Sequence, residues 1–462
     1  MKIRKIISGL TAAVILAAVC GCSGGENNGK LTLSVGDWPS DVDQTKLQTF
    51  TGYEQEFEEQ NPDIDIKPDT YSYDTKTFTM KATAGQLPNL YNSWFAETAQ
   101  IIKNGYAADI TDQMKKYGYD KAMNPELLEF VSDDNGRIYG FPTSAYAMGL
   151  YINKDVFTAA GLVNADGSVM IPDTYEEMME YAKIIKEKTG KGGFMMATTD
   201  NCGGWQFMNI AWSYGVNFTE QDSDGKWKAT FNTSQAKEAL QYIYDMKWTA
   251  NAMPDQTVVS MNDLLQLFAT GNIGMMIANP PCQSLASNYD INKDSVVVAK
   301  IPAGPEGRFS QMGGDLVMFS NTCTPEQIEA GFKWLSYRGY SPEWNEETEA
   351  KQRTVYEDAE KLGQFILPQN AFDLWKDENY CNGYKKLAKE YTNVKEENWD
   401  SYFKGFEEDV TIRPEEPVSC QELYSILDRC IQEVITNRDA DINGLIEEAN
   451  NDFQTNHLDK AE

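Results

Sequence analysis

Hydrophobic and polar positions alternate at the start of the chain in the pattern of a strand, a helix and a second strand. Residues 31–35 alternate with period two and predict a strand, residues 49–60 predict a helix, and residues 64–66 begin the next strand. Strands that alternate with helices indicate a parallel sheet covered by helices. In such sheets, ligands bind in the crevice beyond the carboxyl ends of the strands.

The segment 138–162 combines two short apolar runs with a loop of small residues. Residues 138–141 and 148–151 predict strands, and Tyr146 is the large aromatic residue of the loop between them. Residues 154–160 then predict a short helix. Two strands that are joined by such a loop suit a crossing of the chain between two lobes.

The length of 462 residues exceeds what one hydrophobic core usually fills, so two domains are expected. Ser419 and Glu422 have the spacing of a capping box at the start of a helix. The region 341–413 is helical, acidic and aromatic, without an assigned role. The remaining patterns predict a helix and a strand within 264–277, strands at 296–301 and 316–319, and helices at 172–188, 325–337 and 439–453.

The N-terminus has the features of an export signal. Three basic residues precede an apolar run at 6–19, which is shorter than the roughly 18 residues that span a bilayer. Val19-Cys20-Gly21-Cys22 has the form of a lipobox, so residues 1–21 are predicted to be a lipoprotein signal peptide and Cys22 the lipidated residue. An ordinary cleaved signal with an incidental cysteine is the alternative. Residues 22–30 are rich in Gly, Ser and Asn and predict a flexible tether.

The charge of the chain restricts its partners. It contains 70 Asp and Glu against 40 Lys and Arg, a net charge of −30. Nucleic acid and anionic membrane surfaces would repel such a protein. The same charge weakly disfavours a strongly anionic ligand, although a local basic pocket could overrule it.

Candidate catalytic and cofactor motifs are few. The one histidine, His457, lies near the C-terminus, and no Cys-x-x-Cys pair occurs, so neither a His-based triad nor a zinc site is predicted. The sequence has no P-loop and no dinucleotide fingerprint, and we expect no cofactor. A pair of carboxylates for glycoside hydrolysis stays open, because their separation cannot be read from the sequence. The six cysteines after Cys22 are predicted to be buried or free.

The crossing segment resembles the signature of the extracellular solute-binding proteins of ABC importers, specifically their large carbohydrate-binding group. Residues 81–94 and the proline and glycine loop of 302–315 fit the same family in the same order. The resemblance covers most of 31–337 and again about 412–453. The residues of the crossing that match are Gly140, Pro142, Tyr151, Asn153, Lys154, Phe157 and Gly161.

This resemblance implies an α/β, two-lobed fold of the periplasmic-binding-protein type, with each lobe a sheet flanked by helices and a hinge that the chain crosses several times. The resemblance also implies a protein that binds its ligand without covalent chemistry and docks on the membrane subunits of an ABC permease. We expect a monomer. The expected boundaries are lobe 1 at 31–142 and 283–337, lobe 2 at 147–278 and 338–462, and hinge crossings at 143–146 and 279–282, with a further crossing near Tyr337.

The candidate ligand residues follow from the chemistry of a sugar. A pyranose presents C–H groups on its faces and hydroxyls at its rim, so its site pairs aromatic walls with amide and carboxylate groups. Tryptophans in loops beside Gly, Pro or Asp, polar groups at predicted strand ends, and the loop tyrosine fit this description, although each could instead pack in a core or cap a turn. The residues chosen are Asp37, Trp38, Asn92, Trp94, Tyr146, Trp205, Asn279, Asp315, Trp344, Trp375 and Trp399.

The sequence therefore predicts a lipid-anchored protein on the outer face of a cell membrane that captures a sugar or oligosaccharide for an ABC permease. Two alternatives remain. One is a lipid-anchored glycoside hydrolase, which turnover of oligosaccharides would reveal. The other is a glycan-capture lipoprotein that works without a permease, which the absence of neighbouring permease genes would favour.

Overall fold

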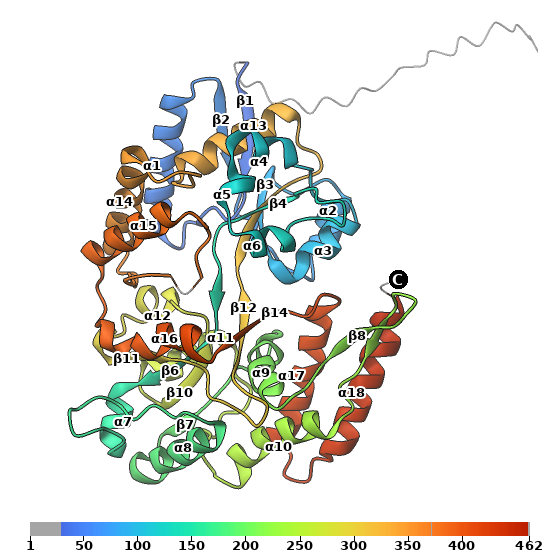
Figure 1. Cartoon of the computed structure of the whole chain (residues 1–462), viewed down its shortest axis with the longest axis vertical. Coiled ribbons are helices and arrows are strands. Elements are labelled where there is room, and N and C mark those ends of the chain that lie inside the picture. Colours follow the sequence, from blue (N-terminus) through green and yellow to red (C-terminus); the bar gives the residue numbers. More distant parts are fainter. Residues whose placement is uncertain (1–28, 371, 461–462) are drawn as a thin grey trace, which may run out of the picture.

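The protein has two lobes, each built on its own β-sheet, with a third sheet between them (Figure 1). The computed structural model describes residues 29–370 and 372–460. The predicted signal peptide and Cys22 lie outside these residues. Two large separate hydrophobic cores, one per lobe, account for most buried side chains. The predicted two-lobed α/β fold is confirmed.

The first lobe contains a five-stranded sheet in the order β2-β1-β3-β13-β4. β1 is parallel to β2 and β3, whereas β13 is antiparallel to β3 and β4. The carboxyl ends of β1 and β3 therefore lie at the same edge as the start of β13. The elements are β1 (Leu31–Val35), α1 (Gln44–Gln60), β2 (Ile64–Pro68), α2 (Phe78–Thr83), β3 (Leu90–Trp94), α3 (Phe95–Lys103), α4 (Thr111–Tyr117), α5 (Tyr119–Ala122), α6 (Pro125–Phe130), β4 (Gly140–Pro142), β13 (Asp315–Phe319) and α13 (Pro325–Tyr337).

The second lobe contains a four-stranded sheet in the order β11-β6-β10-β7 and a separate β8–β9 hairpin. Its strands are almost wholly buried, since helices cover both faces. The elements are β6 (Gly149–Asn153), α7 (Lys154–Ala160), α8 (Tyr175–Thr189), β7 (Gly192–Phe194), α9 (Cys202–Ser213), β8 (Thr219–Gln221), β9 (Trp227–Ala229), α10 (Ser234–Trp248), α11 (Met261–Ala269), β10 (Ile273–Ala278), α12 (Gln283–Ser287), β11 (Val296–Ala299), α16 (Asp400–Glu408), α17 (Cys420–Thr436) and α18 (Ile442–Asn456), with short 3-10 turns at Lys293–Ser295, Glu396–Asn398 and Leu458–Lys460.

One predicted boundary between the lobes is wrong. The sequence placed all of 283–337 in the first lobe, but β11 pairs with β6, and Leu285 of α12 lies in the core of the second lobe. The chain therefore does not recross at 279–282. Residues 279–282 instead form a turn with a cis Pro280-Pro281 bond at the end of β10, and the return to the first lobe occurs between β12 and β13.

A three-stranded sheet, which we call the linking sheet, joins the lobes. It consists of β5 (Tyr146–Ala147), β12 (Phe309–Gly313) and β14 (Thr411–Pro414), in the order β14-β12-β5. Tyr146, predicted on a loop, thus belongs to a short strand and pairs with Gly313. A Cβ at Gly313 would lie 2.6 Å from the Tyr146 hydroxyl, and one at Gly314 would lie 2.3 Å from the Ser144 carbonyl oxygen. Only glycine fits where the strand leaves this sheet.

The helices α14 (Glu346–Lys361) and α15 (Glu378–Tyr391) connect to both lobes. Asn124 of the first lobe donates its backbone N–H to the Leu374 carbonyl at 2.8 Å. In the second lobe, the Gln283 side chain donates to the Phe365 carbonyl at 2.9 Å and accepts the Phe365 N–H at 2.7 Å. The sequence assigned all of 338–462 to the second lobe. Much of 338–391 instead packs on the first.

The C-terminal helices form as predicted, but the predicted capping box does not. Ser419 has a φ of 47° and its side chain makes no capping hydrogen bond to α17. Glu422 instead interacts electrostatically with Glu97 of the first lobe. The six cysteines of the described residues are free.

Candidate functional site

Helix α9 runs alongside β12 of the linking sheet, in the opposite direction. The Phe309 N–H donates to the Ser213 hydroxyl at 3.3 Å, and the Gln311 N–H donates to the Asn209 side-chain oxygen at 2.8 Å. Four residues of a helix advance about 6 Å, and two residues of a strand advance about 6.6 Å. The helix and the strand therefore stay in step from one contact to the next.

Continuing the pairing of α9 with β12 by four helix residues and two strand residues brings Trp205 to the end of the linking sheet. Trp205 lies four residues before Asn209 on the same face of α9, so this register predicts that it is level with Gly313, two residues beyond Gln311. Gly313 pairs with Tyr146, and both aromatic side chains are partly exposed. Two predicted ligand residues from distant parts of the sequence thus lie near the point where β12 enters the first lobe.

The first lobe presents polar and aromatic groups at the edge of its sheet that faces this point. Asp315 of β13 is paired in register with Trp94 of β3. The Trp94 ring is 38% exposed, and it packs edge-on against Tyr73 with the ring centroids 5.0 Å apart. The Ser144 hydroxyl donates to the Asp315 carboxylate at 2.9 Å, and burial raises the pKa of this carboxyl.

Asp37 adds a second carboxyl at the same edge. It follows β1 with a φ of 53°, and the Ser72 hydroxyl donates to one of its oxygens. The other oxygen, Oδ2, is buried without a hydrogen-bond partner among the described residues. Burial raises the pKa of Asp37, and the charge of Asp315 raises it further, while a backbone hydrogen bond from Asn92 lowers it. The structure thus brings together Asp37, Asn92, Trp94 and Asp315.

The two lobes meet through carboxyl side chains that the sequence analysis did not select. Glu97, at the start of α3, accepts the Tyr73 hydroxyl at 2.5 Å. Glu415, between β14 and α17, accepts the Tyr424 hydroxyl at 2.8 Å and a backbone hydrogen bond at Ala96 of the first lobe. No local pattern distinguishes these two among 70 acidic residues. We call this region, together with the edge of the first sheet and the end of α9, the junction.

The start of α9 is also fixed at the junction. The carboxylate of Asp428 in α17 accepts the backbone N–H of Asn201 at 2.8 Å and that of Gly204 at 2.7 Å. Asp200 forms an ion pair with Lys76 of the first lobe, with 3.8 Å between Nζ and Oδ1. The hydrogen bonds to Asp428 fix the turn before Trp205 on α17, and the exposed ion pair of Asp200 reaches the first lobe.

Three of the predicted ligand tryptophans are buried in hydrophobic cores instead. Trp38 is 4% exposed and stacks on Trp334 at 6.1 Å, Trp375 is 7% exposed, and Trp399 is fully buried. A sugar cannot reach a ring that the core already covers, so these three predictions are wrong for this conformation. The other two predicted residues lie elsewhere. Trp344 packs against Tyr380 at 5.3 Å, and Asn279 directly follows β10, where its carbonyl accepts the Tyr151 hydroxyl at 3.2 Å.

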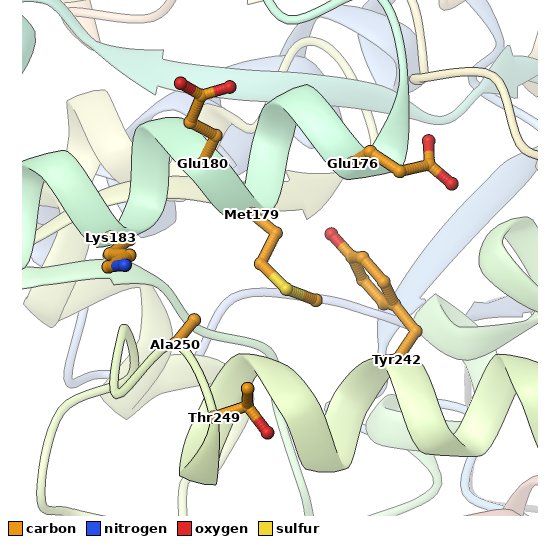
Figure 2. Close-up of a pocket in the computed structure, with 7 residues that line it drawn as sticks. All are labelled: Glu176, Met179, Glu180, Lys183, Tyr242, Thr249 and Ala250. Carbon is orange, nitrogen blue, oxygen red and sulfur yellow. The ribbon is translucent and has the colours of Figure 1, made fainter.

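A surface pocket of about 380 Å³ lies on the second lobe, between α8 and α10 (Figure 2). Met179 and Tyr242 point into it, with acidic and basic groups of α8 at its rim. The Tyr242 hydroxyl is already used, because it donates to the Tyr175 carbonyl at 3.0 Å. The pocket is separate from the junction. It is lined by Glu176, Met179, Glu180, Lys183, Tyr242, Thr249 and Ala250.

Other kinds of site find no support in the part of the chain that the structure describes. Residues 29–370 and 372–460 contain no group of three or more His, Cys, Asp or Glu side chains that could hold a metal ion. In the same residues, no helix is both long and apolar enough to cross a bilayer.

We expect the free energy of unfolding to fall as the pH rises from 5 to 8. Burial raises the pKa of both Glu97 and Glu415 to about 7 and that of Asp428 to about 6. In this range the folded protein binds more protons than the unfolded chain, so raising the pH favours unfolding. Urea unfolding at several pH values measures this, and a stability that rises between pH 5 and 8 would contradict it.

Comparisons with solved structures show that the chain shares a two-lobed α/β fold with them. Maltose-bound MalE3 of T. maritima superposes with a TM-score of 0.67 at 21% identity, over 92% of this chain and 99% of that one. A solute-binding protein of Thermotoga lettingae bound to α-D-tagatose superposes with a TM-score of 0.69 at 19% identity, over 92% and 98%. These likenesses confirm the fold.

The family follows from the sequence. The model of the bacterial extracellular solute-binding proteins matches residues 42–337, well over half of the chain, and the chain belongs to this family. Two relatives, both 25% identical to it, are named as binding proteins. They are the arabinooligosaccharide-binding protein of Halalkalibacterium halodurans, over 49% of this chain and 48% of that protein, and the polygalacturonan/rhamnogalacturonan-binding protein YtcQ of Bacillus subtilis, over 59% and 56%.

Proposed function

We propose that this protein captures a sugar or oligosaccharide between its two lobes and delivers it to the membrane subunits of an ABC permease. The family and its named relatives support this role. The observation that carries it is the junction, where Trp205 and Tyr146 lie near the edge that presents Trp94 and Asp315. Aromatic faces and carboxylate acceptors together are the groups that a pyranose requires.

The protein works by binding and release. A ligand that contacts both lobes stabilises the closed arrangement relative to the open one, and this difference in affinity is what shifts the equilibrium. Trp94 and Asp315 contact the sugar from the first lobe and Trp205 from the second, while Tyr146 contacts it from the linking sheet. No bond of the ligand is made or broken, so the protein is not an enzyme. It acts as a monomer that presents a loaded surface to the permease.

The proposed location is the outer face of the cell membrane. The signal peptide of residues 1–21, lipidation at Cys22 and the tether of residues 22–30 would hold the protein there. We expect Cys22→Ala to release the protein into the medium of a single-membrane host. In such a host the lipid on Cys22 is the proposed anchor, and the variant cannot carry it. Immunoblotting of medium and membrane fractions measures this. Equal retention of both forms would contradict lipid anchoring.

Calorimetry against a panel of oligosaccharides, combined with small-angle scattering, tests the proposed function. We expect at least one sugar to bind and to reduce the radius of gyration, because the lobes close on it. The reducing-end content of the same mixtures should stay constant over hours. Accumulation of reducing ends would show a glycoside hydrolase instead, and failure of every sugar to bind or to change the scattering would refute capture of a carbohydrate.

A further inference from the structure

Two carboxyl side chains from opposite lobes share the junction. Glu97 belongs to α3 of the first lobe, and Glu415 precedes α17 of the second. Their charges repel across the junction: the charge of Glu97 raises the pKa of Glu415, and the charge of Glu422 of α17 raises the pKa of Glu97. The groups that hydrogen-bond the two carboxyls are the hydroxyls of Tyr73 and Tyr424 and the backbone at Ala96. Apart from the hydrogen bond at Ala96, the interactions between side chains of the two lobes here are therefore between acidic groups.

Lys46 acts electrostatically on Asp37, at the edge of the first sheet, but two other basic groups near the junction are directed to other partners. Lys76 pairs with Asp200. Arg413 of β14 donates to the Asn217 side chain at 2.8 Å and lies 3.6 Å from Glu416, with its guanidinium over the Trp212 ring. These contacts place the charge of Arg413 toward the second lobe rather than beside Glu415.

Two buried acceptor atoms at the junction have no hydrogen-bond donor among the described residues. Gln311 of the linking sheet is fully buried, and its amide nitrogen donates to the Tyr424 hydroxyl, which in turn donates to Glu415. The Gln311 carbonyl oxygen, Oε1, has no partner among the described residues, and neither does Oδ2 of Asp37. Buried acceptors without donors are rare in folded proteins. Such a site calls for a ligand that brings hydrogen-bond donors.

We propose that Glu97 and Glu415 determine the charge of the ligand, so that the junction selects a neutral saccharide and rejects one built of uronic acids. A neutral sugar brings hydroxyl donors for the two carboxylates. A uronate instead brings acceptors and negative charge next to two carboxylates, which repel it at short range. This inference rests on the proposed function, because it specifies the sugar class for the same site.

Calorimetry with four named trisaccharides tests the proposal. The neutral probes are maltotriose, xylotriose and β-1,4-galactotriose, and the acidic probe is trigalacturonate. At pH 8 and low salt, we expect the best neutral probe to bind at least 100-fold more tightly than trigalacturonate. If trigalacturonate binds as tightly as the best neutral probe, the inference is overturned and the proposed function stands. If neither the four trisaccharides nor any of a wider panel of saccharides binds, both this inference and the proposed function are refuted.

A pair of double variants assigns the effect to these two residues. In Glu97→Gln/Glu415→Gln, we expect the preference for the neutral probe over trigalacturonate to narrow by at least 10-fold, because both charges are removed while an amide oxygen remains for each tyrosine hydroxyl. Glu447→Gln/Glu448→Gln makes the same change of net charge on the exposed face of α18 and should leave the preference unchanged. Equal behaviour of the two double variants, with both folded by circular dichroism, overturns the assignment.

The pH dependence of the preference gives an independent readout. Burial raises the pKa of Glu97 and of Glu415 to about 7, so both carboxyls are largely neutral at pH 5.5, where galacturonate remains ionised. The titratable groups that face them are Tyr73, Glu422 and Tyr424, together with Cys420 and Tyr146, which Glu415 affects. We expect the preference for the neutral probe to narrow from pH 8 to pH 5.5. A preference that is constant or wider at pH 5.5 overturns the proposal.

Discussion

Trp205→Ala is expected to weaken the binding of the best oligosaccharide about 10- to 100-fold. Trp205 lies level with Gly313 at the end of the linking sheet, and its ring is partly exposed, so it can cover one face of a sugar. Loss of that apolar contact costs about 1 to 3 kcal/mol, which corresponds to one or two orders of magnitude in the dissociation constant. Isothermal titration calorimetry measures the change.

Trp227→Ala is the matched control for this variant. Trp227 is also partly exposed and also belongs to the second lobe, but it lies on the β8–β9 hairpin beside Gln454 of the C-terminal helix. Its removal should leave the affinity within about two-fold, because it is not part of the junction. If Trp205→Ala and Trp227→Ala bind alike while both remain folded, Trp205 does not contact the ligand.

Gly204→Ala is expected to reduce both stability and affinity. A Cβ at Gly204 would lie 2.4 Å from the Tyr424 carbonyl oxygen and 2.5 Å from its Cα, so α9 and α17 would have to separate. Overpacking of this kind costs about 1 to 3 kcal/mol. The same movement shifts Trp205, the next residue, and the Tyr424 hydroxyl that contacts Glu415. Urea unfolding and calorimetry on one preparation measure the two effects.

Gly52→Ala makes the same chemical change in an open position. Gly52 lies inside α1, and a Cβ there would meet nothing within 4 Å. Alanine favours a helix by about 1 kcal/mol over glycine, so this variant should be as stable as the original protein or more stable. Equal free energies of unfolding for Gly204→Ala and Gly52→Ala would show that the two helices tolerate a methyl group between them.

Local pattern predicted most elements of the fold because each depends on short-range periodicity. The helix predicted at 325–337 has these bounds in the structure, and the strand predicted at 296–301 forms as β11. The sheet that β11 joins could not be predicted. All four of its side chains are buried and apolar, and such a strand fits the middle or the edge of either sheet equally well.

The candidate site was predicted only in part, for a similar reason. Trp94 ends β3 and Trp38 follows β1, both beside small or polar residues, but only Trp94 is exposed. The ring of Trp38 is covered by Trp334, which comes from a helix almost 300 residues later. Glu97 and Glu415 come from distant parts of the chain in the same way. Partners so far apart in sequence leave no periodic signal near either residue.

The linking sheet also decides how the lobes can move. Its three strands are hydrogen-bonded side by side, so they resist twisting, and we expect the backbone to bend mainly where β12 leaves the sheet at Gly313 and Gly314. Tyr146 lies opposite Gly313, close to the axis of that rotation. A side chain near a pivot moves little while the outer rims of the lobes move several times farther. We therefore expect a sugar that binds on Tyr146, as proposed, to keep this contact throughout closure of the lobes.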